Sequence, residues 1–254
     1  MMKHLAFFFM LLALNGCSPL NLKSNRGLPS PDEVQLHALK GLDRRFTHLT
    51  PRSDLAAGQS VNVGERLGRV QEPPADKYHE KIIKADSLYY SGNYAAAKQS
   101  IEAVYQQEPD NLFAIELYAR VLFRVEERSK SFELYTDLMR KLDGGVTKEF
   151  VNVDMWFIDA YAKLGALYLD RREFGRAAYE ISRSVVGGFA RRYFDANPAA
   201  LEMDLSYLTE AYFHLNNHEW SRYYAALTLK YFPANTYVLQ YLSKMPAGQP
   251  GKSL

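Results

Sequence analysis

The stretch that decides the fold is "SGNYAAAKQSIEAVYQQEPDN", residues 91–111. It belongs to a long segment, from Lys77 to about Met245, in which apolar residues recur with the spacing of one helix face. Patterns typical of strands are absent from the sequence of this segment. We therefore expect an all-α domain over residues 77–245, and the quoted stretch is the clearest part of an internal repeat.

Residues 78–111, which end with this stretch, closely resemble a tetratricopeptide repeat. Such a repeat is a pair of antiparallel helices of about 34 residues, with small residues where the helices cross, an aromatic residue after the turn and Pro near the end. The resemblance implies a superhelical solenoid, in which each helix pair buries its apolar face against a neighbour. It assigns the crossing to Ala85 and Ala97, the position after the Gly92-Asn93 turn to Tyr94, the interior to Ile101 and Val104, and the stop to Pro109.

Two further units follow the same pattern. The second begins at Leu112, and the third carries "YAKLGALY", residues 161–168, which contains the aromatic, Leu-Gly and Tyr positions of a first helix. The matching positions are Ala119 and Ser131 at the second crossing, Leu122, Tyr135 and Leu138 as their apolar partners, and Phe174 and Ala177 in the third unit.

The fourth unit departs from strict spacing, because the bulky Tyr223 stands where a small residue is required. We expect a slightly longer turn at "NNHEW", residues 216–220, with Ala211 and Ala225 at the crossing. Behind this crossing come Leu229 and Phe232. A last amphipathic segment, "TYVLQYLSKM", would cap the open end of the array, followed by a flexible tail at 246–254.

Two insertions of about a dozen residues interrupt the repeats, after the second and the third units. The later one, "GGFARRYFDANP", combines two arginines with two aromatic residues, Arg191, Arg192, Tyr193 and Phe194. It is either a loop whose rings pack onto the helices or a contact with a partner.

The N-terminus has the form of a secretory signal peptide over residues 1–16. "MMKH" is followed by about ten apolar residues and then by Gly16, too short a run to span a bilayer. The sequence from Leu14 to Cys17 resembles the lipobox of bacterial lipoproteins, although Asn15 stands where a small residue is usual. This resemblance implies cleavage before Cys17 and acylation of Cys17. Because Ser18 follows rather than Asp, it implies sorting to the outer membrane, facing the periplasm.

Residues 17–76 are polar and broken by Pro and Gly, which indicates a mostly disordered tether. One short helix is expected inside it. Ser30 is a suitable N-cap, Pro31 follows, and Val34, Ala38 and Leu42 share one face. This helix would be loose or packed against the main domain.

Composition and motifs argue against several classes of function. The charge is nearly balanced, with 31 Lys and Arg against 29 Asp and Glu, so no basic field for nucleic acid is expected. The single Cys excludes an intramolecular disulfide, and no P-loop, GxGxxG, HExxH or GxSxG motif occurs. We expect neither an enzyme nor a cofactor, metal or small-molecule substrate. His214 and His218 have the spacing of metal ligands on a helix, but they flank an expected turn. Glu126 and Glu127 are expected to be solvated residues of another turn.

The resemblance also implies a concave groove lined by the first helix of each pair. Aromatic residues and arginines are mixed there, as in protein-binding hot spots, so the groove would suit a peptide with acidic and apolar residues. Arg120, Phe123 and Arg124 should point toward the same side. The implied groove positions are Tyr89, Tyr90, Phe113, Glu116, Arg120, Phe123, Arg124, Asp159, Leu169 and Tyr212.

Together these patterns predict a lipid-anchored periplasmic adaptor or assembly factor for an envelope machine, such as a pilus, a secretion system or outer-membrane protein insertion. The alternative is a regulatory scaffold that recruits peptidoglycan-active or proteolytic enzymes. The choice among these machines rests on analogy with lipoproteins of the same architecture.

Overall fold

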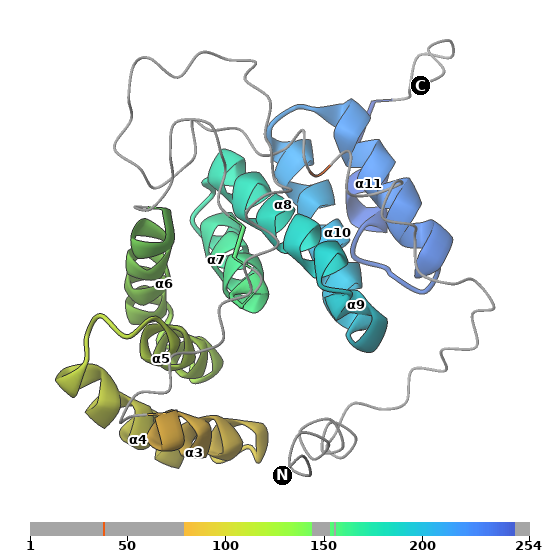
Figure 1. Ribbon diagram of the computed structural model, residues 1–254. Coiled ribbons are helices and arrows are strands. Elements are labelled where there is room, and N and C mark those ends of the chain that lie inside the picture. Colours follow the sequence, from red (N-terminus) through yellow and green to blue (C-terminus); the bar gives the residue numbers. More distant parts are fainter. Residues whose placement is uncertain (1–37, 39–78, 144–152, 155, 247–254) are drawn as a thin grey trace.

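The protein is all-α over the part of the chain that the computed structural model describes, which is residues 38, 79–143, 153–154 and 156–246 (Figure 1). No strand occurs among these residues, as the sequence predicts. The helices are α3 (His79–Tyr90), α4 (Tyr94–Gln107), α5 (Leu112–Arg124), α6 (Arg128–Asp143), α7 (Ile158–Asp170), α8 (Phe174–Ala190), α9 (Tyr193–Ala196), α10 (Pro198–His214), α11 (His218–Tyr231) and α12 (Leu239–Leu242).

The helices form four pairs, α3–α4, α5–α6, α7–α8 and α10–α11, whose connecting turns share one geometry. The middle residue of each turn is left-handed, with φ of 80° at Gly92, 63° at Glu126, 60° at Arg172 and 58° at Asn216. The N–H of the next residue donates to a carbonyl in the last turn of the first helix, for example Asn93 to Leu88 at 2.9 Å. This Schellman arrangement satisfies carbonyls that the helix end would otherwise leave unpaired.

The expected longer turn in the fourth pair is wrong. Asn216 takes the left-handed position, which Asn tolerates well, so the turn has the same length as the others. Thr209 and Ser221 therefore meet where the helices cross, in place of Ala211 and Ala225. The Ser221 hydroxyl donates to the Thr209 carbonyl at 2.8 Å, as the Ser131 hydroxyl donates to Ala119 in the second pair. A hydroxyl fits a close crossing because it bonds the facing backbone.

The crossings expected in the first three pairs are confirmed. Ala85 and Ala97 are fully buried, as are Ala119 and Ser131. At Gly165 an added Cβ would lie 2.4 Å from Cγ1 of Ile181, so only glycine allows α7 and α8 to approach this closely. The expected interior residues of these pairs, including Ile101, Val104, Tyr135 and Leu138, are all buried.

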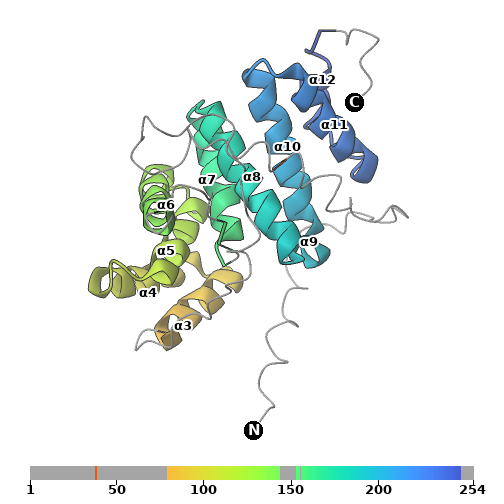
Figure 2. The same ribbon diagram turned by 45° about the horizontal axis from the view of Figure 1, so that its top comes forward.

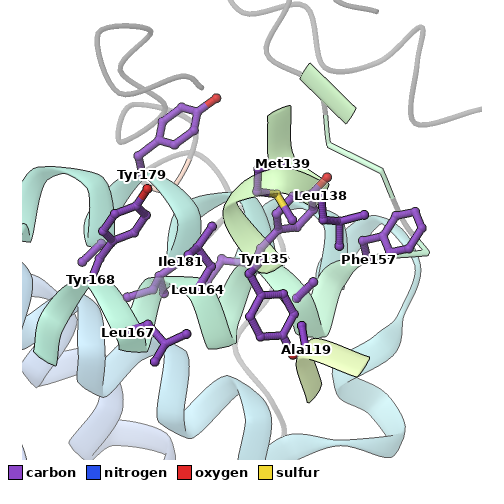
Figure 3. Close-up of a cluster of buried hydrophobic side chains, with 14 of the residues drawn as sticks. Ala119, Tyr135, Leu138, Met139, Phe157, Leu164, Leu167, Tyr168, Tyr179 and Ile181 are labelled. Atoms are coloured by element: carbon purple, nitrogen blue, oxygen red, sulfur yellow. The ribbon is translucent and has the colours of Figure 1, made fainter. Parts of the chain in front are cut away.

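Successive pairs stack through their second helices. α4 packs against α5, α6 against α7 and α8 against α10, while α3, α5, α7 and α10 contact one another in that order. Figure 3 shows part of the resulting core, where Tyr135 and Leu138 of α6 gather with Leu164 of α7 and Ile181 of α8. The four first helices, which lie in sequence across Figure 2, thus form one continuous surface. This surface is named the first-helix face.

The insertion at 187–198 is not a loop, contrary to one expectation. α8 continues through Gly187 and Gly188 to Ala190, and α9 follows after the left-handed Arg192. The ring of Phe194 packs where a Cβ on Gly188 would lie 2.3 Å away, and it is fully enclosed by the core. The absence of a side chain, which weakens an isolated helix, here makes room for this ring.

The structure describes the C-terminal segment of the helical domain but only Ala38 of the region before residue 79. The C-terminal segment packs as expected: Val238 and Tyr241 are buried, and α12 contacts α10 and α11. Ala38 is helical and buried in the common core. The predicted signal peptide, Cys17, the rest of the predicted tether and residues 247–254 lie outside the described residues. None of the described helices has the length and apolar character to cross a membrane.

Candidate functional site

Arg120 organises the centre of the first-helix face. Its guanidinium lies 2.6 Å from the Asp86 carboxylate, and Nη1 donates to the Tyr90 hydroxyl at 3.0 Å. Nε lies 3.3 Å from the Glu116 carboxylate, without hydrogen-bond geometry. The ring centres of Tyr89 and Tyr90 are 4.9 and 5.5 Å from the guanidinium carbon. Arg120 is therefore already paired with two carboxylates and covered by two rings.

Helix periodicity and the stacking of pairs explain this grouping. Asp86 and Tyr90 are four residues apart on α3, so they share one side of it, and the same spacing joins Glu116 and Arg120 on α5. Because α3 contacts α5, the two sides meet.

α7 extends the cluster with Asp159 and Lys163, which form an ion pair at the same spacing. Burial acts to raise the pKa of Asp159, but Lys163 and Arg120 outweigh it and hold the pKa below its usual value. Burial is the strongest influence even though 38% of the Asp159 side chain is exposed.

Glu116 occupies a similar environment, since burial raises its pKa more than Arg120 lowers it. The residues that lie together in this way are named the Arg120 cluster. They are Asp86, Tyr89, Tyr90, Glu116, Arg120, Asp159 and Lys163.

Tyr135 lies beneath the Arg120 cluster. It comes from α6, its side chain is fully buried, and its hydroxyl has no hydrogen-bond partner. Burial raises its pKa, and the negative charges of Glu116 and Asp159 raise it further. An unpaired hydroxyl in the interior carries a cost that a suitable partner would remove.

Tyr193 and Asp204 border the cluster on the side of α9 and α10. Burial raises the pKa of Tyr193, and the charges of Asp159, Asp204 and Tyr90 contribute. Asp204 is buried and accepts a hydrogen bond of 2.7 Å from the Ser184 hydroxyl. Burial raises the pKa of Asp204 to about 8, so its carboxyl group is largely protonated at neutral pH.

Four of the predicted groove residues lie elsewhere. Phe113 packs against Phe157 and Trp156, and Leu169 and Tyr212 are core residues. The prediction that Arg120, Phe123 and Arg124 point to one side is wrong for Phe123, whose ring lies under Arg128, which pairs with Asp170 of α7. Arg120 and Arg124 lie over Tyr89 and Tyr94, whose ring centres are 5.5 Å apart. Residues three apart differ by about 60° around a helix, enough to face different neighbours.

The insertion residues do not form a single surface either. Arg191 covers the Trp156 ring at 4.3 Å, Arg192 pairs with Asp195 and is 84% exposed, and Phe194 is core. Only Tyr193 belongs near the Arg120 cluster.

Sequence reasoning missed Asp86, Lys163 and Asp204. The spacing of Asp159 and Lys163 was a usable signal for one of them. Asp204 is one of two acidic residues in the largely apolar stretch "ALEMDLSYL", residues 200–208, which was a signal for it, although the stretch could not show what Asp204 faces. Asp86 gave no signal, because its partner comes from another pair.

Two histidines, His214 and His218, lie outside the Arg120 cluster. His214 stacks on Phe174, with ring centres 4.3 Å apart, and His218 lies against Phe213. The part of the chain that the structure describes holds no cluster of metal-ligating side chains.

A second arginine cluster is closed to water. Arg183 of α8 lies 2.9 Å from Asp143 and 3.3 Å from Glu180. Its guanidinium carbon is 4.2 and 5.5 Å from the ring centres of Tyr161 and Tyr179. This cluster joins the end of α6 to α7 and α8 and is a structural lock.

Comparisons of the chain with family models, with curated proteins and with solved structures gave no match. The function is therefore inferred from the residues of this chain.

Proposed function

We propose that this protein is a tetratricopeptide-like adaptor that holds a protein partner on its first-helix face. The four equivalent turns and the small residues at the crossings support the repeat assignment. The order of packing, with each second helix against the next first helix, supports the assignment to a solenoid. A solenoid of this kind offers an extended surface for recognition.

The Arg120 cluster is the observation that carries the proposal. Tyr90 is 62% exposed, and its hydroxyl and ring both contact Arg120. Tyr and Arg are the residues that most often anchor protein partners. Tyr89 and Tyr193 enlarge the aromatic surface around the charges.

The same proposal attaches the protein to a membrane through acylated Cys17. The described helices offer no membrane span, so attachment is assigned to the lipid, with two acyl chains making a stable anchor. The polar tether would let the helical domain reach a partner in the periplasm. An assembly factor for an envelope machine is the role that fits a tethered adaptor.

Site-specific photo-crosslinking in cells tests the adaptor role. A photoreactive residue at Tyr90 should give a discrete adduct with a partner protein. The matched control is Gln99, which is exposed on α4 and lies outside the first-helix face. Equal adducts at both positions, or none at Tyr90, would contradict the proposal.

The anchor is tested separately by Cys17→Ser. This variant should lose acyl labelling and no longer fractionate with the outer membrane. Retention there after signal-peptide cleavage would show that another segment attaches the protein.

A further inference from the structure

α8 is buried on every side, unlike the second helix of the first pair. Every residue from Ala177 to Gly188 is buried, whereas α4 has one side exposed to water. The second, sixth and ninth residues after the small residue at each crossing lie on the side of the helix opposite the crossing, here named the outer side. They are Gln99, Ala103 and Gln106 in α4, which are exposed, and Tyr179, Arg183 and Val186 in α8, which are 0% exposed.

Described neighbours cover part of this outer side. Arg183 pairs with Asp143 at the end of α6 and lies over the ring of Tyr161 of α7. At the C-terminal end of α8, a Cβ on Gly187 would lie 3.0 Å from Cγ1 of Val153, which precedes α7. The end of α6 and the residues before α7 therefore account for the burial of this half of α8.

Tyr179, nearer the start of α8, is enclosed in a different way. Its side chain points away from Leu164 and Ile181 of the core between α7 and α8 (Figure 3). The hydroxyl is shielded from water, yet it has no hydrogen-bond partner among the residues that the structure describes. A polar cover would pair with such a hydroxyl, so the group that encloses it is apolar.

Ala38 shows that a segment far from the helical domain in sequence packs into the same core. It is helical and 0% exposed, and it belongs to the same cluster of buried residues as Tyr179. The sequence places Val34 and Leu42 on the same helix face as Ala38. This face is apolar, as the cover of Tyr179 must be.

We propose that residues 31–42 dock as a helix on the outer side of α8, with the face of Val34, Ala38 and Leu42 over Tyr179. The docking goes beyond the adaptor role and does not depend on it. If Cys17 is acylated, only residues 18–30 remain as a free connection to the lipid. That connection spans roughly 45 Å when fully extended, against roughly 200 Å for residues 18–76, so α8 is held toward the membrane.

Photo-crosslinking within the purified mature chain identifies the cover. p-Benzoylphenylalanine replaces Tyr179, and mass spectrometry after trypsin digestion maps the adduct. We expect an intramolecular link to residues 27–40, the tryptic peptide that contains Ala38. The matched control is the same residue at Gln99, the equivalent exposed position of α4, which should give no link to this peptide. Links only to residues 144–152, to residues 45–76 or to a second copy of the chain would overturn the inference.

Ala38→Arg tests the docking without any change in α8. A charged side chain without a partner is strongly disfavoured in the interior, so the segment should detach. Glu-C protease should then cleave after Glu33 at least about tenfold faster, because cleavage follows the population of the detached form. Cleavage after Glu65 should stay the same. Ala57→Arg, in the predicted tether, is the matched control.

Equal cleavage after Glu33 in Ala38→Arg and Ala57→Arg would contradict the docking, as would cleavage after Glu33 in the wild type as fast as after Glu65. Thermal unfolding monitors the helical domain, and if Ala38→Arg unfolds it, the crosslink from position 179 decides. Neither measurement involves a partner or a membrane. A discrete Tyr90 adduct in cells would therefore still support the adaptor function if the docking fails.

Discussion

Arg120 and Arg183 have the same kinds of neighbours and different access to water. Each guanidinium lies between two carboxylates and two tyrosine rings, and each receives one carboxylate from its own helix. The Arg120 side chain is 12% exposed, whereas that of Arg183 is 0% exposed. The same kinds of neighbours therefore surround two arginines that differ in their access to water, and location in the stack of helices decides this access.

The physical difference is the medium around the charges. Transfer of a charge from water into the interior is costly, so a buried pair stabilises little in total but is severely destabilising when one partner is removed. At Arg120 the carboxylates retain contact with water, so they tolerate the loss of the arginine and can exchange partners. In the proposed adaptor, the partly exposed cluster around Arg120 is the one that a partner would contact.

Arg183→Met should have the largest effect. It leaves Asp143 and Glu180 buried without their cation, and the expected loss of unfolding free energy is about 3–5 kcal/mol. Urea denaturation measures it. Arg176→Met on the same helix is the control, since Arg176 is about half exposed and should cost less than about 1 kcal/mol. Equal losses would remove the distinction between buried and exposed arginines.

Asp204 offers an intermediate case, a buried carboxyl at the edge of the exposed cluster. Its pKa is about 8 in the folded protein, raised by burial and by Asp159 and lowered by Ser184 and Lys163. The folded state thus keeps a proton that the unfolded state releases near pH 4. Stability should fall as pH rises from about 4 to 8, by up to about 1.4 kcal/mol per pH unit from this group.

Asp204→Asn removes this titration and should flatten the fall in stability. Urea denaturation of both proteins at pH 5 and pH 8 gives the comparison. The variant should gain relative to wild type at the higher pH, and a parallel response of both proteins would assign the pH dependence to other groups.

Arg120→Met should cost the fold far less than Arg183→Met, about 1 kcal/mol, because Asp86 and Glu116 can be hydrated in its absence. Thermal and urea unfolding of the two variants under the same conditions measure the ratio. A loss as large as that of Arg183→Met would make Arg120 a second structural lock and weaken its assignment to recognition.

The smallest effect is expected at the turns, where the environment is fully exposed. Arg172 holds a left-handed conformation that glycine adopts without strain, so Arg172→Gly should stabilise by about 0.5–1 kcal/mol. Gly92→Ala is the converse, with no atom within 4 Å to obstruct the new methyl group and only backbone strain to oppose it. In thermal unfolding, the melting temperature should rise for Arg172→Gly and fall for Gly92→Ala.

The sequence determined the features that depend on a few neighbouring residues. Helix periodicity, the turn at Gly92 and Asn93, and the small residues at Ala85, Ala97 and Gly165 all follow from short-range chemistry. Tyr89, Tyr90, Glu116, Arg120 and Asp159 were also identified as members of one face. Each follows from its place within a single helix pair, and these pairs have one repeated geometry.

Only the tertiary structure decided which partners those residues meet. Asp86 reaches Arg120 from the preceding pair, Phe194 fills the space over Gly188, and Ser221 replaces an alanine at the fourth crossing. These contacts depend on how helices distant in sequence approach one another, and a hydroxyl or a ring can satisfy the same space as a methyl group. Spacing along the chain determines which side of a helix a residue occupies. The stacking of pairs determines which side chains from other helices lie next to it.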